Sequence, residues 1–351
     1  MKTSIKTNYV KYLFIVSFLM LGTTAFAQEE EAAAEKKFSI SGTVDAYYRA
    51  NLNSANSGSN YSAPGSSFAN LPGFALGMAN VIANYEGDKV GFTADLVFGP
   101  RGTDAVFASP LYSNTGDIIN QLYVYWNVSE SVTLTFGNWN TFLGYEVISP
   151  AGNFNYSTSY LFSYGPFSHT GLKADFDLGS DWSLMLAVMN PTDITEFNPN
   201  GKYAYGAQLG YSGQYLNFVA DDGAFEIDFT GGFDLSDEFY LGINAAYFDG
   251  ADDGPGFYGA ALYPQYKTSD VFTIGLRGEY FSEDGNFGAI GTGVDDSSVF
   301  AVTLTGSATI GDLVIKPELR LDSTSDDAFL DSDGDPMSGL SSFVLAAVYA
   351  F

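Results

Sequence analysis

The chain lacks cysteine altogether and has a single histidine, His169, among its 351 residues. The absence of thiols excludes disulfide cross-links, thiol catalysis, iron–sulfur clusters and cysteine-ligated zinc. One imidazole leaves little material for a histidine-based metal site or a Ser–His mechanism. His169 stands between Ser168 and Thr170, but adjacent residues of a strand point to opposite faces and cannot hydrogen-bond side chain to side chain. We therefore interpret His169 as a structural residue and expect neither enzymatic activity nor a cofactor.

Basic residues are also scarce, with 14 Lys and Arg against 41 Asp and Glu, which gives a formal net charge of −27. Removing the three lysines of an expected signal peptide leaves 11 basic residues against 41 acidic ones, a charge of about −30. This balance argues against binding nucleic acid or anionic headgroups through a basic patch. Only 16% of the residues are charged, however, while 16% are aromatic and 39 are glycine. Such a composition is typical of an outer-membrane barrel rather than of a soluble acidic protein.

Long apolar runs are missing after residue 27, which excludes a transmembrane helix there. Residues 1–27 combine a basic start, a short apolar stretch at 12–21 and the small-x-small sequence Ala25-Phe26-Ala27. This pattern predicts a cleaved signal peptide, and the apolar stretch is too short for the alternative, an N-terminal membrane anchor. We expect a short acidic lead at 28–37 and one domain over 38–351.

The recurring pattern in the rest of the chain has a period of two residues. In KFSISGTVDAYYRA, for example, Phe38, Ile40 and Val44 share one face, and polar residues occupy the other. Seven tight polar turns are expected at 86–89, 129–131, 179–181, 212–214, 236–238, 267–270 and 311–312. Eight mostly longer connections alternate with them at 51–72, 100–117, 140–165, 190–202, 221–224, 249–256, 284–297 and 323–338. Together they predict an all-β, antiparallel up-and-down barrel of about sixteen strands, with short periplasmic turns and longer extracellular loops.

A soluble β-sandwich has the same periodicity, and three features favour the membrane over it. The expected strands run ten or more residues, which is long for a sandwich but suits a tilted membrane strand. Aromatic residues stand near the strand ends on the apolar face, as interfacial girdles require: Trp126, Trp182, Tyr85, Tyr211 and Tyr280. Every basic residue within a strand falls on the polar face: Arg49, Lys89, Lys173, Arg277, Lys316 and Arg320. A cation facing the middle of the bilayer costs about 2–4 kcal/mol, so lipid would enforce this distribution.

Four segments carry a resemblance to a known family. They are GNFNYSTSYLFSYGPFSHTGLKADF at 152–176, LAVMNPTD at 186–193, the opening ISGTVDAYYRANLN and the stretch LPGFALGMANVIANYEGDKVGFTADLVFGPRG. They resemble the OmpL-like β-barrel porins. The chain is most similar to members from Bacteroidota-type Gram-negative bacteria, over most of its length. The resemblance implies an outer-membrane channel of uncharacterised substrate. The resemblance identifies no ligand-binding residues, because the similar segments are strands and loops rather than a catalytic motif.

For a pore, function lies in the charges of the lumen wall, which set ion preference. Thirteen charged residues of the polar faces are predicted to line the pore: Asp45, Arg49, Asp95, Lys173, Asp175, Glu226, Asp228, Arg277, Glu279, Lys316, Glu318, Arg320 and Asp322. The alternative is that many of them pair across neighbouring strands and fix the register. We expect both, with pairing dominant for roughly half of them.

The third long connection, 140–165, is the candidate for a constriction. It is too aromatic to extend freely into water, and the barrel interior offers a surface on which it can pack. The candidate residues are Phe142, Tyr145, Glu146, Phe154, Tyr156 and Tyr160. The alternatives are a loop that lies over the rim and one that takes part in a subunit contact.

The last long connection contains Asp331, Asp333 and Asp335 around Gly334, which resembles part of a calcium-binding loop. The distal glutamate of that pattern is missing, so a solvated acidic loop is the favoured interpretation. No metal site is expected beyond weak binding of divalent ions, including those that bridge lipopolysaccharide.

The sequence ends in SSFVLAAVYAF, in which Phe343, Leu345, Tyr349 and Phe351 share one face. We expect this segment to be the last strand, which closes against the first and leaves no open edge. The terminal Phe351 also resembles the signal that the barrel-assembly machinery recognises.

We therefore expect a passive channel in the outer membrane of a Gram-negative bacterium, in contact with lipid and lipopolysaccharide. It would pass small hydrophilic solutes or ions, with a mild cation preference from its acidic outer loops. A homotrimer follows by analogy with other sixteen-stranded barrels. The alternative function is a surface-displayed structural or adhesive barrel with an occluded lumen.

Overall fold

The structure, a computed structural model, describes residues 38–106 and 118–351. The expected signal peptide at 1–27 and lead at 28–37 lie outside the described residues. So does most of the second expected connection, at 107–117.

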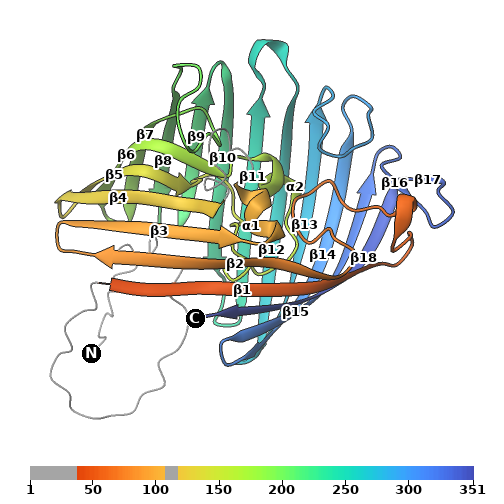
Figure 1. Ribbon diagram of the computed structural model, residues 1–351. Helices are drawn as coiled ribbons and strands as arrows, with labels where there is room; N and C mark the ends of the chain where they lie inside the picture. The colour runs from red at the N-terminus through yellow and green to blue at the C-terminus, as the bar shows by residue number, and fades with distance from the viewer. Residues whose placement is uncertain (1–37, 107–117) are drawn as a thin grey trace.

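Sixteen strands form one closed antiparallel barrel (Figure 1). They are β1 (Phe38–Asn51), β2 (Gly73–Glu86), β3 (Val90–Phe98), β4 (Ile119–Ser129), β5 (Val132–Asn140), β6 (Ser168–Gly179), β7 (Trp182–Met189), β8 (Ala204–Tyr211), β9 (Gln214–Asp221), β10 (Ala224–Asp234), β11 (Phe239–Asp249), β12 (Gly256–Ser269), β13 (Phe272–Asp284), β14 (Ser298–Ile310), β15 (Leu313–Thr324) and β18 (Gly339–Ala350). The predicted fold class and strand number are confirmed.

The remaining elements are short and lie in the connections. A two-stranded hairpin, β16 (Phe329–Leu330) and β17 (Pro336–Met337), is part of the last long loop. Two short α-helices, α1 (Pro100–Ala105) and α2 (Tyr160–Tyr164), lie within the ring of strands (Figure 1). Single 3₁₀ turns occupy η1 (Gly58–Asn60) and η3 (Ala251–Asp253). No helix in the described ranges is long and apolar enough to cross a membrane.

Closure joins the first and last strands, as the end of the sequence predicts. β1 pairs with β18 from Thr43 opposite Ala350 to Asn51 opposite Ser342. The ladder continues past β18, because Gly42 and Phe351 exchange backbone hydrogen bonds of 3.1 and 3.0 Å. Every strand of the ring therefore has two neighbours, which satisfies the backbone without an open edge.

The connections alternate as the sequence predicts, with seven short turns at one end of the barrel and, at the other, longer loops together with the two-residue connection between β9 and β10. Turn chemistry explains the short ones. Between β8 and β9, Ser212 and Gly213 both have positive φ values, of 51° and 86°. Positive φ at both central residues defines a type I′ turn, whose twist matches that of paired strands.

The two faces of the wall differ in the way that lipid outside and protein inside require. On β18, Leu345 and Tyr349 point outward and are exposed, whereas Val344 and Val348 point inward and are buried. The aromatic residues predicted for the girdles also lie outward, with Trp126 about half exposed. The interior holds clusters of buried apolar residues. The largest of them joins Tyr160 and Leu161, from the long connection between β5 and β6, to the inner faces of β12, β13 and β14.

Arginine in place of Leu345 tests whether this outer face meets lipid. Leu345 lies at the centre of β18 and is 42% exposed. Leu345→Arg should lower the free energy of unfolding by about 2–4 kcal/mol, because a cation would face the bilayer interior. Denaturant titration of protein refolded into liposomes measures the loss. Leu52→Arg, at an exposed position in the loop directly after β1, is the control and should cost about 0–1 kcal/mol. Equal costs for the two variants would contradict a lipid-facing outer wall.

Candidate functional site

The connection between β5 and β6, residues 141–167, folds into the barrel instead of extending from its rim. We call this segment the inner loop. Its backbone and side chains bond to inward-facing residues of β1, β10, β13, β14 and β15. The loop thus packs against the inner wall, as the sequence analysis favoured over a position on the rim or in a subunit contact.

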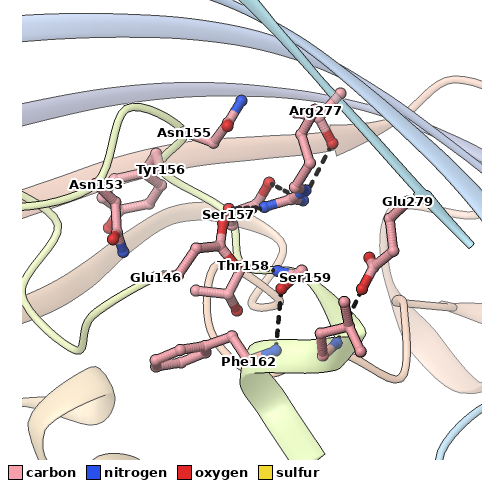
Figure 2. A network of polar contacts seen from close by, with 12 residues as sticks. Glu146, Asn153, Asn155, Tyr156, Ser157, Thr158, Ser159, Phe162, Arg277 and Glu279 are labelled. Atoms are coloured by element: carbon pink, nitrogen blue, oxygen red, sulfur yellow. Dashed lines mark hydrogen bonds and ion pairs between the residues drawn. The ribbon is translucent and has the colours of Figure 1, made fainter. Parts of the chain in front are cut away.

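Two wall glutamates hold the loop through its backbone N–H groups. Glu318 on β15 accepts hydrogen bonds from the amides of Tyr156 at 2.5 Å and Ser157 at 3.0 Å. Glu279 on β13 accepts from the amides of Tyr160 at 3.0 Å and Leu161 at 2.8 Å, at the start of α2 (Figure 2). A carboxylate that accepts two N–H groups replaces its lost hydration and satisfies two backbone donors. Each glutamate therefore fixes a pair of successive loop residues.

Basic wall residues bind the carbonyl groups of the same loop. Lys316 donates to the carbonyl oxygens of Pro150, at 2.8 Å, and Asn153. Arg320 donates to that of Thr158 at 2.8 Å and pairs with Asp322 at 2.7 Å. Acidic wall side chains thus accept from the N–H groups of the loop, and basic wall side chains donate to its carbonyl groups.

A buried ion pair connects the first part of the inner loop to β13. Arg277 contacts Glu146 of the loop at 2.7 Å and also donates to the carbonyl oxygen of Ser157 at 2.6 Å (Figure 2). The second carboxylate oxygen of Glu146 accepts from the amide of Ser159 at 2.7 Å. Ser159 in turn caps α2, because its hydroxyl oxygen accepts from the amide of Phe162 at 3.0 Å. Glu146 therefore links the wall to the helix start.

Aromatic loop residues pack over wall glycines. A Cβ atom at Gly275 of β13 would lie 2.5 Å from the ring of Phe154, and one at Gly242 of β11 would lie 2.4 Å from the ring of Tyr145. No real Cβ atom tolerates such distances, so only glycine leaves room for these rings. Phe142 lies over Gly206 of β8 in the same manner. Among the other candidates, Tyr156 and Tyr160 are fully buried, and the Tyr156 hydroxyl donates to Asp45 on β1.

All thirteen residues predicted to line the pore lie in wall strands, and most are covered. Eleven of them are less than 5% exposed: Asp45, Arg49, Asp95, Glu226, Asp228, Arg277, Glu279, Lys316, Glu318, Arg320 and Asp322. Seven of these eleven bond to the inner loop: Asp45, Asp228, Arg277, Glu279, Lys316, Glu318 and Arg320. Lys173 and Asp175 on β6 are partly exposed and pair with each other at 3.0 Å. The ion pairs of these residues run along one strand or to the loop.

Arg101 also holds the inner loop and is absent from the sequence-based candidates. It lies on α1, outside any strand, and donates to the carbonyl oxygens of Ile148 at 2.7 Å and Tyr156 at 3.0 Å. Its guanidinium also lies 4.4 Å from the ring centre of Phe68. The one sequence feature that could have indicated this role is a basic residue within the otherwise uncharged stretch VFGPRG.

His169 and the acidic hairpin have structural surroundings. The Nε2 atom of His169 lies 3.0 Å from the Thr141 hydroxyl, and its ring packs against Phe142. Asp331 accepts hydrogen bonds from the amides of Asp333 at 2.8 Å and Asp335 at 2.9 Å, which explains the spacing as a turn. Within the described ranges, no group of three or more acidic or histidine side chains is arranged to hold a metal.

Asp193, in the loop between β7 and β8, fixes the end of the inner loop. Its carboxylate accepts from the amides of Phe167 at 2.7 Å and Ser168 at 2.9 Å. Burial raises the pKa of Asp193 to about 6, Asp221 adds to the rise, and the two amides oppose it.

A closed sixteen-stranded barrel with a loop folded inside it defines a porin-type outer-membrane channel protein. Residues 37–351 match the model of the family described as "Putative beta-barrel porin-2, OmpL-like". The chain belongs to this family of porin-like outer-membrane proteins. A comparison with curated proteins found no match.

Solved structures share the fold at low sequence identity. OmpF of Salmonella typhi, in complex with daunomycin, has a TM-score of 0.58 at 10% identity, covering 90% of this chain and 97% of its own. The outer membrane channel DcaP of Acinetobacter baumannii has a TM-score of 0.56 at 13% identity, covering 90% and 97%. An anion-selective porin from Comamonas acidovorans also scores 0.56, at 12% identity, covering 90% and 99%.

Replacement of Glu318 tests the attachment of the loop. Glu318→Gln removes the charge that strengthens the bonds from Tyr156 and Ser157, and should cost about 1–3 kcal/mol of stability. It should also make the inner loop more susceptible to limited proteolysis. Denaturant titration and protease digestion in detergent measure the two effects. Glu86→Gln, at the exposed end of β2, is the matched control, and equal behaviour of the two variants would contradict the anchoring role.

The Asp193 carboxyl gives a pH dependence whose sign is fixed. Because its pKa is higher in the folded protein than in the unfolded chain, stability should fall as the pH rises from about 4 to about 6. Asp193→Asn keeps an acceptor for both amides and should remove this part of the dependence. Unfolding midpoints measured across that pH range test it, with the exposed turn variant Asp237→Asn as control. An unchanged slope in Asp193→Asn would contradict the prediction.

Proposed function

We propose that the protein is a passive diffusion channel for small hydrophilic solutes or ions, narrowed by its inner loop. The observation that carries the proposal is the attachment of residues 144–161 to charged wall residues inside a barrel of a porin family. A loop fixed at this depth restricts passage to solutes that fit beside it. Channel selectivity then follows from the width and charge of the remaining space.

A mild cation preference is part of the proposal. The loops at the end opposite the short turns carry exposed carboxylates, among them Asp252, Asp253, Asp295, Asp296 and Asp327. Such a field raises the local concentration of cations at the mouth of a pore. Basic wall residues act against it less than their number suggests, because Lys316, Arg277 and Arg320 are bound to the loop or to acids.

The second candidate is a structural or adhesive surface barrel with an occluded lumen. One observation favours it: eleven of the thirteen charged residues expected to face water are almost fully buried, and seven of them bond to the inner loop. A barrel filled in this way would display its loops without conducting.

Further parts of the proposal concern the cell. Residues 1–27 would direct export, Phe351 would be recognised by the barrel-assembly machinery, and the outer wall would contact lipid and lipopolysaccharide. A homotrimer remains an analogy with other barrels of this size. Cross-linking in native membranes tests the trimer.

Single-channel recording separates the two candidate functions. Protein refolded into planar bilayers should show small, steady conductance steps, and a salt gradient should give a reversal potential of the cation-selective sign. Replacing residues 144–164 by a short Gly-Ser linker should raise conductance severalfold, because the space filled by the loop becomes water. Shortening the β16–β17 hairpin, which lies in the last long loop at the end of the barrel (Figure 1), is the control.

The outcomes are distinct. A silent wild type with a conducting loop variant supports the occluded barrel. A reversal potential of the opposite sign removes the cation preference alone. If neither the wild type nor a correctly folded loop variant conducts, the channel function is wrong.

A further inference from the structure

Glu226 on β10 is buried without a partner. The residue is 4% exposed, and although its backbone pairs with β9 and β11, its carboxylate takes part in no hydrogen bond or ion pair with any residue of the described ranges. The other wall glutamates differ, since Glu279 and Glu318 each accept two backbone N–H groups. A buried carboxylate without compensation is costly, so something outside the described residues has to neutralise it.

The side chain of Glu226 faces a small cavity between the wall and the inner loop. The cavity has a volume of about 10 Å³ and is lined by Glu226, Asp228, Gly144, Gly165 and Asn244, among others. The Oε1 atom of Glu226 lies 3.6 Å from the position that a Cβ atom would take at Gly165. This space is about that of one water molecule, and therefore of one desolvated ion.

Asp228, the neighbouring acid on the same face of β10, has hydrogen-bond donors that replace its lost hydration. Asp228 accepts hydrogen bonds from the amide of Gly144 at 3.0 Å, from the Asn217 side chain at 2.6 Å and from the Asn244 side chain. Three neutral donors stabilise the ionised form of a carboxylate without cancelling its charge. The cavity therefore has two carboxylates on one side, and the described residues that line it include no base.

We propose that this cavity is a binding site for a single hard metal cation, held by the carboxylates of Glu226 and Asp228. Oxygen ligands and a net negative charge are what Ca²⁺ and Na⁺ require. Amide and backbone oxygens of the lining residues would complete the shell, since only two acids converge here. The competing explanation is a proton shared between the two carboxylates. The site does not depend on whether the lumen conducts.

Isothermal titration of the refolded full chain with CaCl₂, and separately with NaCl, tests the site. Wild type should bind one cation per chain. Glu226→Gln should weaken binding by at least about tenfold, because a ligand charge is lost. Gly165→Ala provides a second variant, since it leaves both charges in place and puts a methyl group into the cavity. It should also weaken binding.

Two controls make the loss specific. Glu283→Gln changes an equally buried glutamate that already accepts from the amides of Gly288 and Ile290. Asp331→Asn changes the acidic hairpin. Both should keep the wild-type affinity, and denaturant titration in a cation-free buffer establishes that every variant is folded.

Each outcome decides the proposal. A single site lost in Glu226→Gln and Gly165→Ala but kept in both controls supports it, and the relative affinities for Ca²⁺ and Na⁺ identify the ion. Wild type that binds neither cation overturns it in favour of a shared proton. A site lost only in Asp331→Asn also overturns it, because the acidic hairpin would then be the binding site.

Discussion

The structure depends on one exchange inside the barrel, in which charged wall side chains satisfy the backbone of the inner loop. An irregular loop buried among strands would leave its N–H and C=O groups unpaired, at about 1–3 kcal/mol each. A buried carboxylate or guanidinium without a partner would cost still more. Glu318 and Lys316, two residues apart on β15, remove both costs, one by accepting amides and the other by donating to carbonyls. The loop and the wall charges therefore require each other.

Steric fit between the aromatic rings of the inner loop and wall glycines is a second constraint on the loop. The rings of Tyr145 and Phe154 occupy places where any wall residue other than glycine would collide with them. The hydrogen bonds fix the height of the loop along the barrel, and these glycine positions fix where its rings rest. Each constraint alone would allow sliding or rotation, whereas the combination selects one arrangement.

The strands, their number and their closure could be predicted from the sequence, because period two and turn chemistry are local signals. Which charges face inward was equally accessible, since lipid excludes them from the other face. The role of those charged residues in holding the inner loop could not be predicted from the sequence. Glu226 and Glu279 stand in similar alternating strands, yet the carboxylate of Glu226 faces a small cavity, whereas that of Glu279 accepts from two loop amides. Only the path of the loop distinguishes them, and that path is set by contacts between residues more than a hundred positions apart. The role of Arg101 could not be predicted from the sequence either, because this residue lies on α1 and belongs to no strand pattern.

The attachment of the loop also limits where a solute could pass. The inner loop bonds to Glu279 on β13, Thr305 on β14 and Glu318 on β15, so it covers the wall around β14. In a ring of sixteen strands, β6 lies diametrically opposite β14. Lys173 and Asp175 on β6 are the two predicted lumen charges that keep appreciable exposure. If the barrel conducts as we propose, a solute would pass on the side of this neutral ion pair rather than beside the concentrated charges of β13 and β15. Selectivity at that level would come from width and from hydrogen-bonding groups, while charge selection would act earlier, at the acidic mouth.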